Sequence, residues 1–236
     1  MVAEASGVTL RILSGLAVRG AFEGGIMAAY EAHTGHRVAV DWVPTTLIMT
    51  KVAAGEQADL LVLIRDAMDK LVAEGKVDPK TRVEVAHSRL GLAVPRGAAH
   101  PPIGTLEEFK AALLGARSIA YSRAGASGIH FETVIERLGI ADAVRSRATV
   151  IPAGFTAEKL VTGEADMAVQ QVSELLVVPG IEVIGKFPEA MQQVSSFSAA
   201  MMAQSPHRAA AEAFLAGLHG PQANAAYVAS GVDPAV

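Results

Sequence analysis

Two short stretches combine hydroxyl groups, glycines and an arginine where an apolar strand-like segment gives way to a helix. The first contains Ser14, Gly15 and Arg19, and the second runs from Ser122 to Gly128 and includes Arg123. A helix N-terminus presents unpaired backbone N–H groups, small residues let a ligand approach that backbone, and arginine adds a forked cationic donor. The matched junctions indicate an anion site, although either junction alone is also typical of an ordinary turn or cap.

Alternating strands and helices position these junctions. The hydrophobic pattern predicts strands at 8–13, 37–42, 59–64, 83–94, 118–121, 149–151, 166–170, 181–184 and 194–203, and helices at 21–33, 47–54, 66–74, 106–114, 130–138 and 157–161, with a helical hairpin over 207–227. This order favours an α/β protein made of two doubly wound lobes. Because ligands bind at the carboxyl ends of parallel strands, the junctions after Leu13, Trp42, Tyr121 and Gln170 should face a common cleft.

Composition narrows the classes of partner. Twenty basic and twenty-four acidic residues give a net charge of −4 without a basic block, so we expect no nucleic-acid partner. The longest uncharged run, residues 190–206, is broken by Gln, Ser and Pro, so we expect no insertion into a membrane. The first residues lack the basic start and apolar run of a secretory signal. The protein is therefore expected to be cytoplasmic if Met1 is the natural start, or periplasmic if a signal peptide has been trimmed.

Several catalytic motifs are missing from the sequence. It has no cysteine and no HExxH, GxSxG, GxxxxGK[ST] or GxGxxG pattern. The seven histidines are scattered, and His33 and His36, the pair with close spacing, sit at a predicted helix end where they complement the dipole. We therefore expect neither a metal nor a cofactor.

A series of motifs, spread over nearly the whole chain, resembles the molybdate-binding-protein-like branch of the type II periplasmic solute-binding proteins. The motifs are LRILSGLAVRGAFE, AYEAHTGHRV, KVAAGEQADLLVL, RLGLAVPRGA, SIAYSRAGASG, GEADMAVQQVSE and FLAGLHGPQA. The resemblance implies two lobes joined by crossing strands, with hinges near Arg89 and Ser198. Lobe 1 would then comprise residues 1–86 and 199–236, and lobe 2 residues 87–198.

The resemblance also implies which residues hold the ligand. In this family hydroxyls and backbone amides bind a small anion, and the corresponding positions here are Ser14, Gly15, Thr45, Thr46, Gly125, Ala126, Ser127, Gln170, Gln171 and Ser173. The second junction adds Ser122 and Arg123.

This sequence departs from the molybdate binders at two of these segments. They tend to carry a serine pair after the first strand and a tyrosine in the fourth ligand segment, where this chain has Ser14-Gly15 and Gln170-Gln171. It also places Arg19, Arg89 and Arg123 at or near the expected cleft. Forked guanidinium donors match carboxylates, so these arginines favour a di- or tricarboxylate over molybdate. For Arg89, a salt bridge between the lobes is the alternative.

Bacterial aconitate isomerases resemble the same fold family. Moving a double bond along a tricarboxylate requires a group that removes a proton and returns it to the neighbouring allylic carbon. His130 is our first candidate for this group, followed by Glu174 and Lys51. The alternative is that His130 makes only local hydrogen bonds and that the other two are solvated.

Two functions follow. We interpret the chain first as a monomeric solute-binding protein that captures a small anion for the membrane component of an ABC-type transporter. The alternative is an isomerase of a small polycarboxylate that uses the same cleft.

Overall fold

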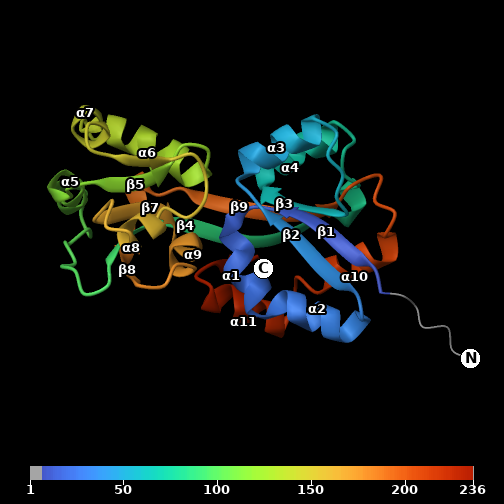
Figure 1. Ribbon diagram of the computed structural model, residues 1–236. Helices are drawn as coiled ribbons and strands as arrows, with labels where there is room; N and C mark the ends of the chain where they lie inside the picture. Colours follow the sequence, from blue (N-terminus) through green and yellow to red (C-terminus); the bar gives the residue numbers. More distant parts are fainter. Residues whose placement is uncertain (1–6, 236) are drawn as a thin grey trace, which may run out of the picture. The chain divides into compact units, whose positions relative to one another are not determined.

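The alternation of strands and helices is present throughout residues 7–235, the part of the chain that the computed structural model describes (Figure 1). Contacts divide these residues into two units, one formed by residues 7–87 and 196–235 and the other by Ser88–Ser195. Strands β4 (Val83–Pro95) and β9 (Val194–Met201) each contain residues of both units. The chain therefore passes from one unit to the other twice, each time within a strand.

The first unit is built on a mixed sheet with the order β2-β1-β3-β9. Strand β1 (Thr9–Ser14) pairs in parallel with β2 (Arg37–Trp42) and β3 (Leu60–Ile64), whereas β3 pairs antiparallel with β9, and β10 (Asp233–Pro234) pairs antiparallel with β4. The helical segments are η1 (Leu16–Val18), α1 (Arg19–Ala21), η2 (Phe22–Ile26), α2 (Met27–Thr34), α3 (Thr45–Ala53), α4 (Arg65–Ala73), η3 (Pro79–Thr81), α10 (Arg208–Ala216) and α11 (Pro221–Ala229).

Both faces of this sheet are covered. Alternate residues of β1 enter different cores, with Ile12 beside Phe22 and Phe214 on one face and Leu13 beside Ile48 on the other. Helices α2, α10 and α11 lie on the first face, and α3 and α4 lie on the second (Figure 1). Burial on both faces explains why β3 is an unbroken apolar run.

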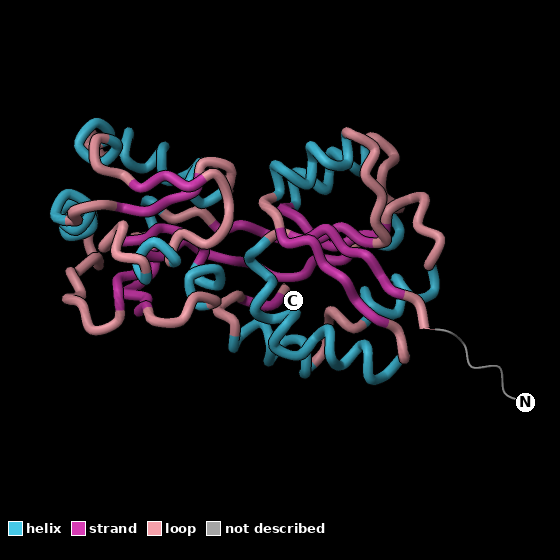
Figure 2. Tube along the Cα trace, viewed as in Figure 1, coloured by secondary structure: helices cyan, strands magenta, loops and turns pink. Residues whose placement is uncertain are grey.

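The second unit repeats this plan. Strand β5 (Ile119–Ser122) pairs in parallel with β6 (Thr149–Ile151) and β7 (Met167–Gln171), whereas β7 and β8 (Ile181–Lys186) both pair antiparallel with β4. The helical segments are α5 (Leu106–Gly115), α6 (Ala126–Arg137), α7 (Ala141–Arg145), α8 (Glu158–Val161), α9 (Val172–Leu176) and η4 (Glu189–Met191), and Figure 2 shows them around the strands. Phe109, Phe131 and Phe187 meet in the core. No helix among the described residues combines the length and the apolar character needed to cross a bilayer.

An aspartate fixes the alignment of two parallel strands in each unit. Asp59, just before β3, accepts a hydrogen bond from the backbone N–H of Arg11 in β1 at 2.8 Å. Asp166, just before β7, accepts from the backbone N–H groups of Arg117 and Ser118, which precede β5, at 2.9 Å each. Charge-assisted bonds of this kind are stronger than neutral ones, so each acid holds two strand starts together.

Two helices begin earlier than the sequence pattern predicts. Helical turns start at Leu16 rather than residue 21, and α6 starts at Ala126 rather than residue 130. In both places glycines and serines gave the stretch the composition of a loop. Gly128 lies inside α6 because only a hydrogen fits there, since a Cβ at this position would lie 1.7 Å from the carbonyl oxygen of Ser122. The pattern also missed α7 and α9, which have five residues each.

Replacing Gly128 with alanine should destabilise the protein by at least about 2 kcal/mol, because the new methyl group meets a backbone oxygen that cannot move independently of β5. The matched control is Gly115→Ala at the end of α5, where a Cβ meets nothing within 4 Å and stability should be unchanged or slightly higher. Urea denaturation midpoints measure both variants. Equal midpoints for the two would contradict the proposed steric constraint.

Candidate functional site

The carboxyl ends of three strands form one edge of the sheet in the second unit. Ser122 at the end of β5 is aligned with Ile151 at the end of β6. The parallel pairing of β5 with β7 aligns Ala120 with Ala168, and the same register continued by two residues places Ser122 beside Gln170. Ligands of α/β sheets bind at this edge. The expected segments Ser122–Ser127 and Gln170–Ser173 lie there, at the carboxyl ends of β5 and β7.

The N-terminus of α6 lies at this edge with no side-chain cap. Gly125 is the N-cap residue, in an extended conformation, and its own N–H donates to the hydroxyl of Ser122 at 3.1 Å. The N–H of Arg123 donates to the carbonyl of Ile151 at 2.8 Å, which fixes the turn while the arginine side chain is exposed. A helix start without a capping side chain, beside an exposed guanidinium, has the donors that an anion requires. The hydroxyl-bearing side chain of Ser127 is buried.

The side chains of the Gln170–Ser173 segment are engaged inside the unit. Gln170 Oε1 accepts from the backbone N–H of Thr156 at 2.8 Å, and Gln170 Nε2 donates to the carbonyl of Gly154 at 2.9 Å. Gln171 Nε2 donates to the hydroxyl of Ser195 at 2.9 Å, and the Ser173 hydroxyl lies 3.3 Å from that of Ser88. Gln170 therefore holds the loop between β6 and α8 in place.

The sequence pattern does not predict two of the partners of these glutamines. The pattern predicts a helix over 157–161, and it contains no sign that the hydroxyl of the preceding Thr156 lies within hydrogen-bond distance of Gln170 Oε1 and of the Val169 carbonyl. Ser195 lies on a predicted crossing strand, and nothing else in the sequence indicates its contact with Gln171. The side-chain oxygen of Gln171, which is 2% exposed, has no hydrogen-bond partner among the described residues.

Glu174 is a buried carboxyl group at the same edge. It lies in the first turn of α9, directly after β7, and is 8% exposed. Burial raises the pKa of Glu174 from its ordinary value of 4.5 to about 8, and hydrogen bonds from the Gln170 side chain and the Gln171 backbone counter only part of this effect. Glu174 is also one of the three residues that the sequence offers for proton transfer.

The other two candidates have partners elsewhere. His130 Nε2 lies 2.8 Å from the carbonyl oxygen of Met191 in η4, so this ring nitrogen is occupied within the unit. Lys51 is in the last turn of α3, where its Nζ lies 3.1 Å from Glu56 and 3.6 Å from Asp41. Lys51 is thus at the opposite end of α3 from Thr45. Within residues 7–235, no three histidine, cysteine, aspartate or glutamate side chains are grouped to hold a metal ion.

The corresponding edge of the first unit carries Ser14, Gly15, Thr45 and Thr46. The Ser14 carbonyl accepts from the Val43 N–H at 3.0 Å and the Gly15 N–H donates to Val62 at 2.8 Å, so this turn lies between the ends of β2 and β3. The buried Ser14 hydroxyl donates to the Gly15 carbonyl at 3.1 Å. Helix α3 starts at Thr45 and Thr46 with no side-chain cap, which again leaves backbone donors at a carboxyl edge.

The three arginines expected at the ligand belong to different units. Arg19 lies in the first unit at the start of α1, where its Nε donates to Glu23 Oε1 at 3.0 Å and its side chain is 33% exposed. Arg89 and Arg123 lie in the second unit, the former half-buried on β4 and the latter exposed. Their convergence on one ligand stays a prediction.

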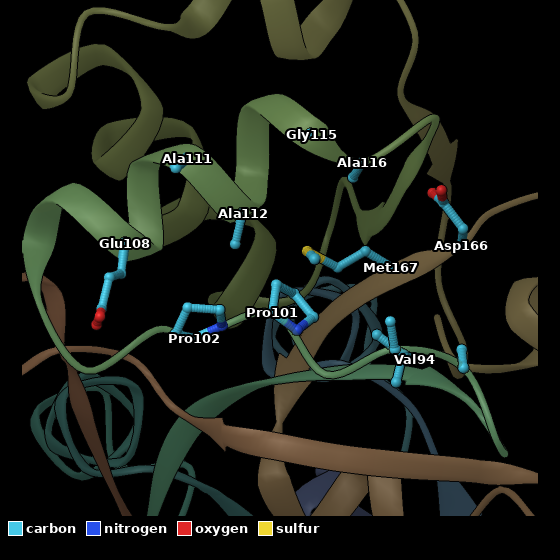
Figure 3. Close-up of a pocket in the computed structure, with 12 residues that line it drawn as sticks. Val94, Pro101, Pro102, Glu108, Ala111, Ala112, Gly115, Ala116, Asp166 and Met167 are labelled. Carbon is cyan, nitrogen blue, oxygen red and sulfur yellow. The ribbon is translucent and has the colours of Figure 1, made fainter.

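A cavity of about 540 Å³ is present elsewhere in the second unit (Figure 3). Small apolar residues of α5 and of the loop after β4 form most of its lining, and Met167 and Asp166 close one side. These two residues lie at the amino end of β7, opposite Gln170 and Gln171. None of the residues predicted to hold the ligand lines this cavity.

Comparisons with known proteins agree with this architecture. Residues 10–233 match the family described as bacterial extracellular solute-binding protein. A curated aconitate isomerase from Pseudomonas sp is 34% identical over 232 residues, covering 96% of this chain and 88% of the relative. The solved periplasmic molybdate-binding protein of Azotobacter vinelandii has a TM-score of 0.79 at 20% identity, covering 94% of this chain and 98% of its own.

The solved sulfate-binding protein of Mycobacterium tuberculosis has a TM-score of 0.73 at 18% identity, covering 96% of this chain and 87% of its own. These likenesses confirm the type II periplasmic-binding-protein fold and the resemblance to its molybdate-binding branch.

The raised pKa of Glu174 predicts how stability depends on pH. Below about pH 4.5 this carboxyl is protonated in the folded and the unfolded chain, whereas between 4.5 and 8 only the unfolded chain releases the proton. The free energy of unfolding should then fall by up to about 1.4 kcal/mol per pH unit from this group. In Glu174→Gln this penalty is absent, so the stability of the variant relative to the parent should increase from pH 5 to pH 8.

Urea unfolding at several pH values measures this difference. Glu164→Gln is the control, because Lys159 lowers the pKa of that exposed carboxyl and the variant should gain no stability over this range. Parallel curves for the parent and Glu174→Gln would mean that the pKa of Glu174 is not raised.

Proposed function

The chain belongs to the family of bacterial extracellular solute-binding proteins, and we propose that it binds a small tricarboxylate and interconverts the cis and trans isomers of aconitate. The observation that carries this proposal is the 34% identity to a curated aconitate isomerase. Because the match covers 96% of the chain, it includes the ligand segments expected in both units. We propose that these segments contact one ligand.

Charge at the carboxyl edges supports a tricarboxylate. Arg123 stands beside the uncapped start of α6, and Arg19 follows the turn at Ser14 and Gly15. A guanidinium group matches a carboxylate through two parallel hydrogen bonds, whereas a tetrahedral oxyanion can be held by neutral donors alone. Arg19, Arg89 and Arg123 would together supply one fork for each carboxylate of the ligand.

The reaction is a proton transfer that needs no oxidant or reductant. A base removes a proton from the methylene carbon of aconitate, the double bond shifts by one carbon, and the proton returns to the carbon that was vinylic. The negative charge that develops between these steps spreads onto the carboxylate groups. Arginine side chains held against those carboxylates would stabilise that charge.

The second candidate function is delivery of a bound anion to the membrane component of an ABC-type transporter, in the periplasm. The family match favours it, as do structural neighbours that are described as molybdate-binding and sulfate-binding proteins. In this role the chain would capture its ligand without changing it.

Proton NMR of the purified chain with trans-aconitate distinguishes these functions. Appearance of cis-aconitate at a rate proportional to protein concentration supports the isomerase. A thermal-shift screen of molybdate, sulfate, phosphate, citrate, both aconitates and smaller dicarboxylates identifies the ligand, since saturation at a hundred times the dissociation constant adds about 2.7 kcal/mol of stability. Stabilisation by any of these anions without conversion favours the transport role, and stabilisation by molybdate or sulfate alone excludes the tricarboxylate.

Arg123→Ala should weaken tricarboxylate binding by about 2 kcal/mol, or roughly thirtyfold, because it removes a charge-assisted hydrogen-bond donor. The matched control is Arg137→Ala, an exposed arginine at the other end of α6, which should leave affinity unchanged. Isothermal titration with the ligand found in the screen measures both. If the two variants bind equally well, Arg123 does not contact the ligand.

A further inference from the structure

Glu174 lacks the ionic partner that buried carboxyl groups usually have. Among the described residues, no charged side chain contributes to the pKa of this carboxyl group, although it is only 8% exposed. Its neighbours are the side-chain amide of Gln170 and the backbone N–H of Gln171, both neutral donors. Burying an acid without a cation costs free energy, and such groups are concentrated at functional sites.

The surroundings of Glu174 are held in place from several directions. Gln170 is anchored on Thr156 and Gly154 of the loop after β6. The neighbouring Gln171 is anchored on Ser195, and Ser173 meets Ser88 of β4. These contacts leave the carboxyl in one environment at the end of β7, which is the positioning that a proton-transfer group requires.

The location also matches the chemistry. The carboxyl follows β7 at the edge that carries the uncapped start of α6 and Arg123. An acid whose pKa burial has brought close to neutral pH can both accept and return a proton there. His130 and Lys51 are less suited, because one ring nitrogen of His130 is bound to the Met191 carbonyl and Lys51 is paired with Glu56 and Asp41.

We propose that Glu174 is the catalytic residue that carries the proton in the isomerisation, an inference that rests on the proposed function. The ionised carboxylate takes a proton from the methylene carbon, and the electron pair of the broken C–H bond forms the new double bond with the central carbon. The electrons of the old double bond then take up a proton from the Glu174 carboxyl group at the former vinylic carbon, which restores the carboxylate. No co-reactant is consumed.

The test compares the variants Glu174→Gln and Glu164→Gln. Glu164 is an exposed residue before β7 whose carboxylate accepts hydrogen bonds from Lys159 and Thr162. Proton NMR follows conversion of trans-aconitate and, in D2O, exchange of the methylene protons. Glu174→Gln should lower both rates by 10²- to 10⁴-fold, while its affinity for the substrate, measured by titration, changes less than threefold. Glu164→Gln should match the parent in all three measurements.

Glu174→Asp provides a second readout, because a shorter carboxylate keeps the chemistry and alters the environment. It should retain part of the turnover, and the ascending limb of its kcat/KM against pH should move, which a purely structural role would not produce. The assignment would be overturned if Glu174→Gln kept the turnover and the exchange rate of the parent. It would also be overturned if His130→Gln lost turnover while Glu174→Gln kept the exchange rate of the parent. A parent chain that converts no aconitate would instead overturn the proposed function itself.

Discussion

The second unit depends on the close approach of α6 to the end of β5, which the hydrogen of Gly128 makes possible. This contact brings the first turn of the helix against the carbonyl of Ser122, so its backbone donors stand at the carboxyl edge of the sheet. Arg123 lies in the short turn that the approach leaves between strand and helix. The steric constraint at Gly128 therefore positions both the backbone N–H donors of α6 and Arg123 at this edge.

Around that constraint, the unit buries polar groups and pairs nearly all of them. Gln170, Thr156 and Gly154 form a connected set that fixes a loop, and Glu174 borders this set without a counter-charge. The hydrogen bonds of Gln170 to Thr156 and Gly154 restrict the movement of these groups, so the carboxyl keeps its environment although the surrounding groups are neutral. A proton-transfer site requires a rigid environment and an acid whose pKa is shifted toward neutral pH. A site that only binds its ligand requires the rigid environment alone.

The sequence predicted the fold class and most strands, because their apolar runs and the glycines that end helices are local signals. It also placed Ser122–Ser127 at a carboxyl edge. It could not predict that Gln170 would hold Thr156, since that contact depends on how two loops meet across the sheet. The burial of Glu174 could not be predicted either, because glutamate side chains are mostly exposed in folded proteins and the pattern gave no sign of α9.

The way the chain divides has a consequence for its synthesis. The second unit is one continuous stretch, Ser88–Ser195, whereas the first is completed by residues 196–235, which supply β9, α10 and α11. Phe197, Phe214 and Tyr227 in this late segment belong to the main core of the first unit. During translation the second unit can thus bury its core while the first still lacks β9, α10 and α11, so the unit whose synthesis begins first is the last to have its core complete.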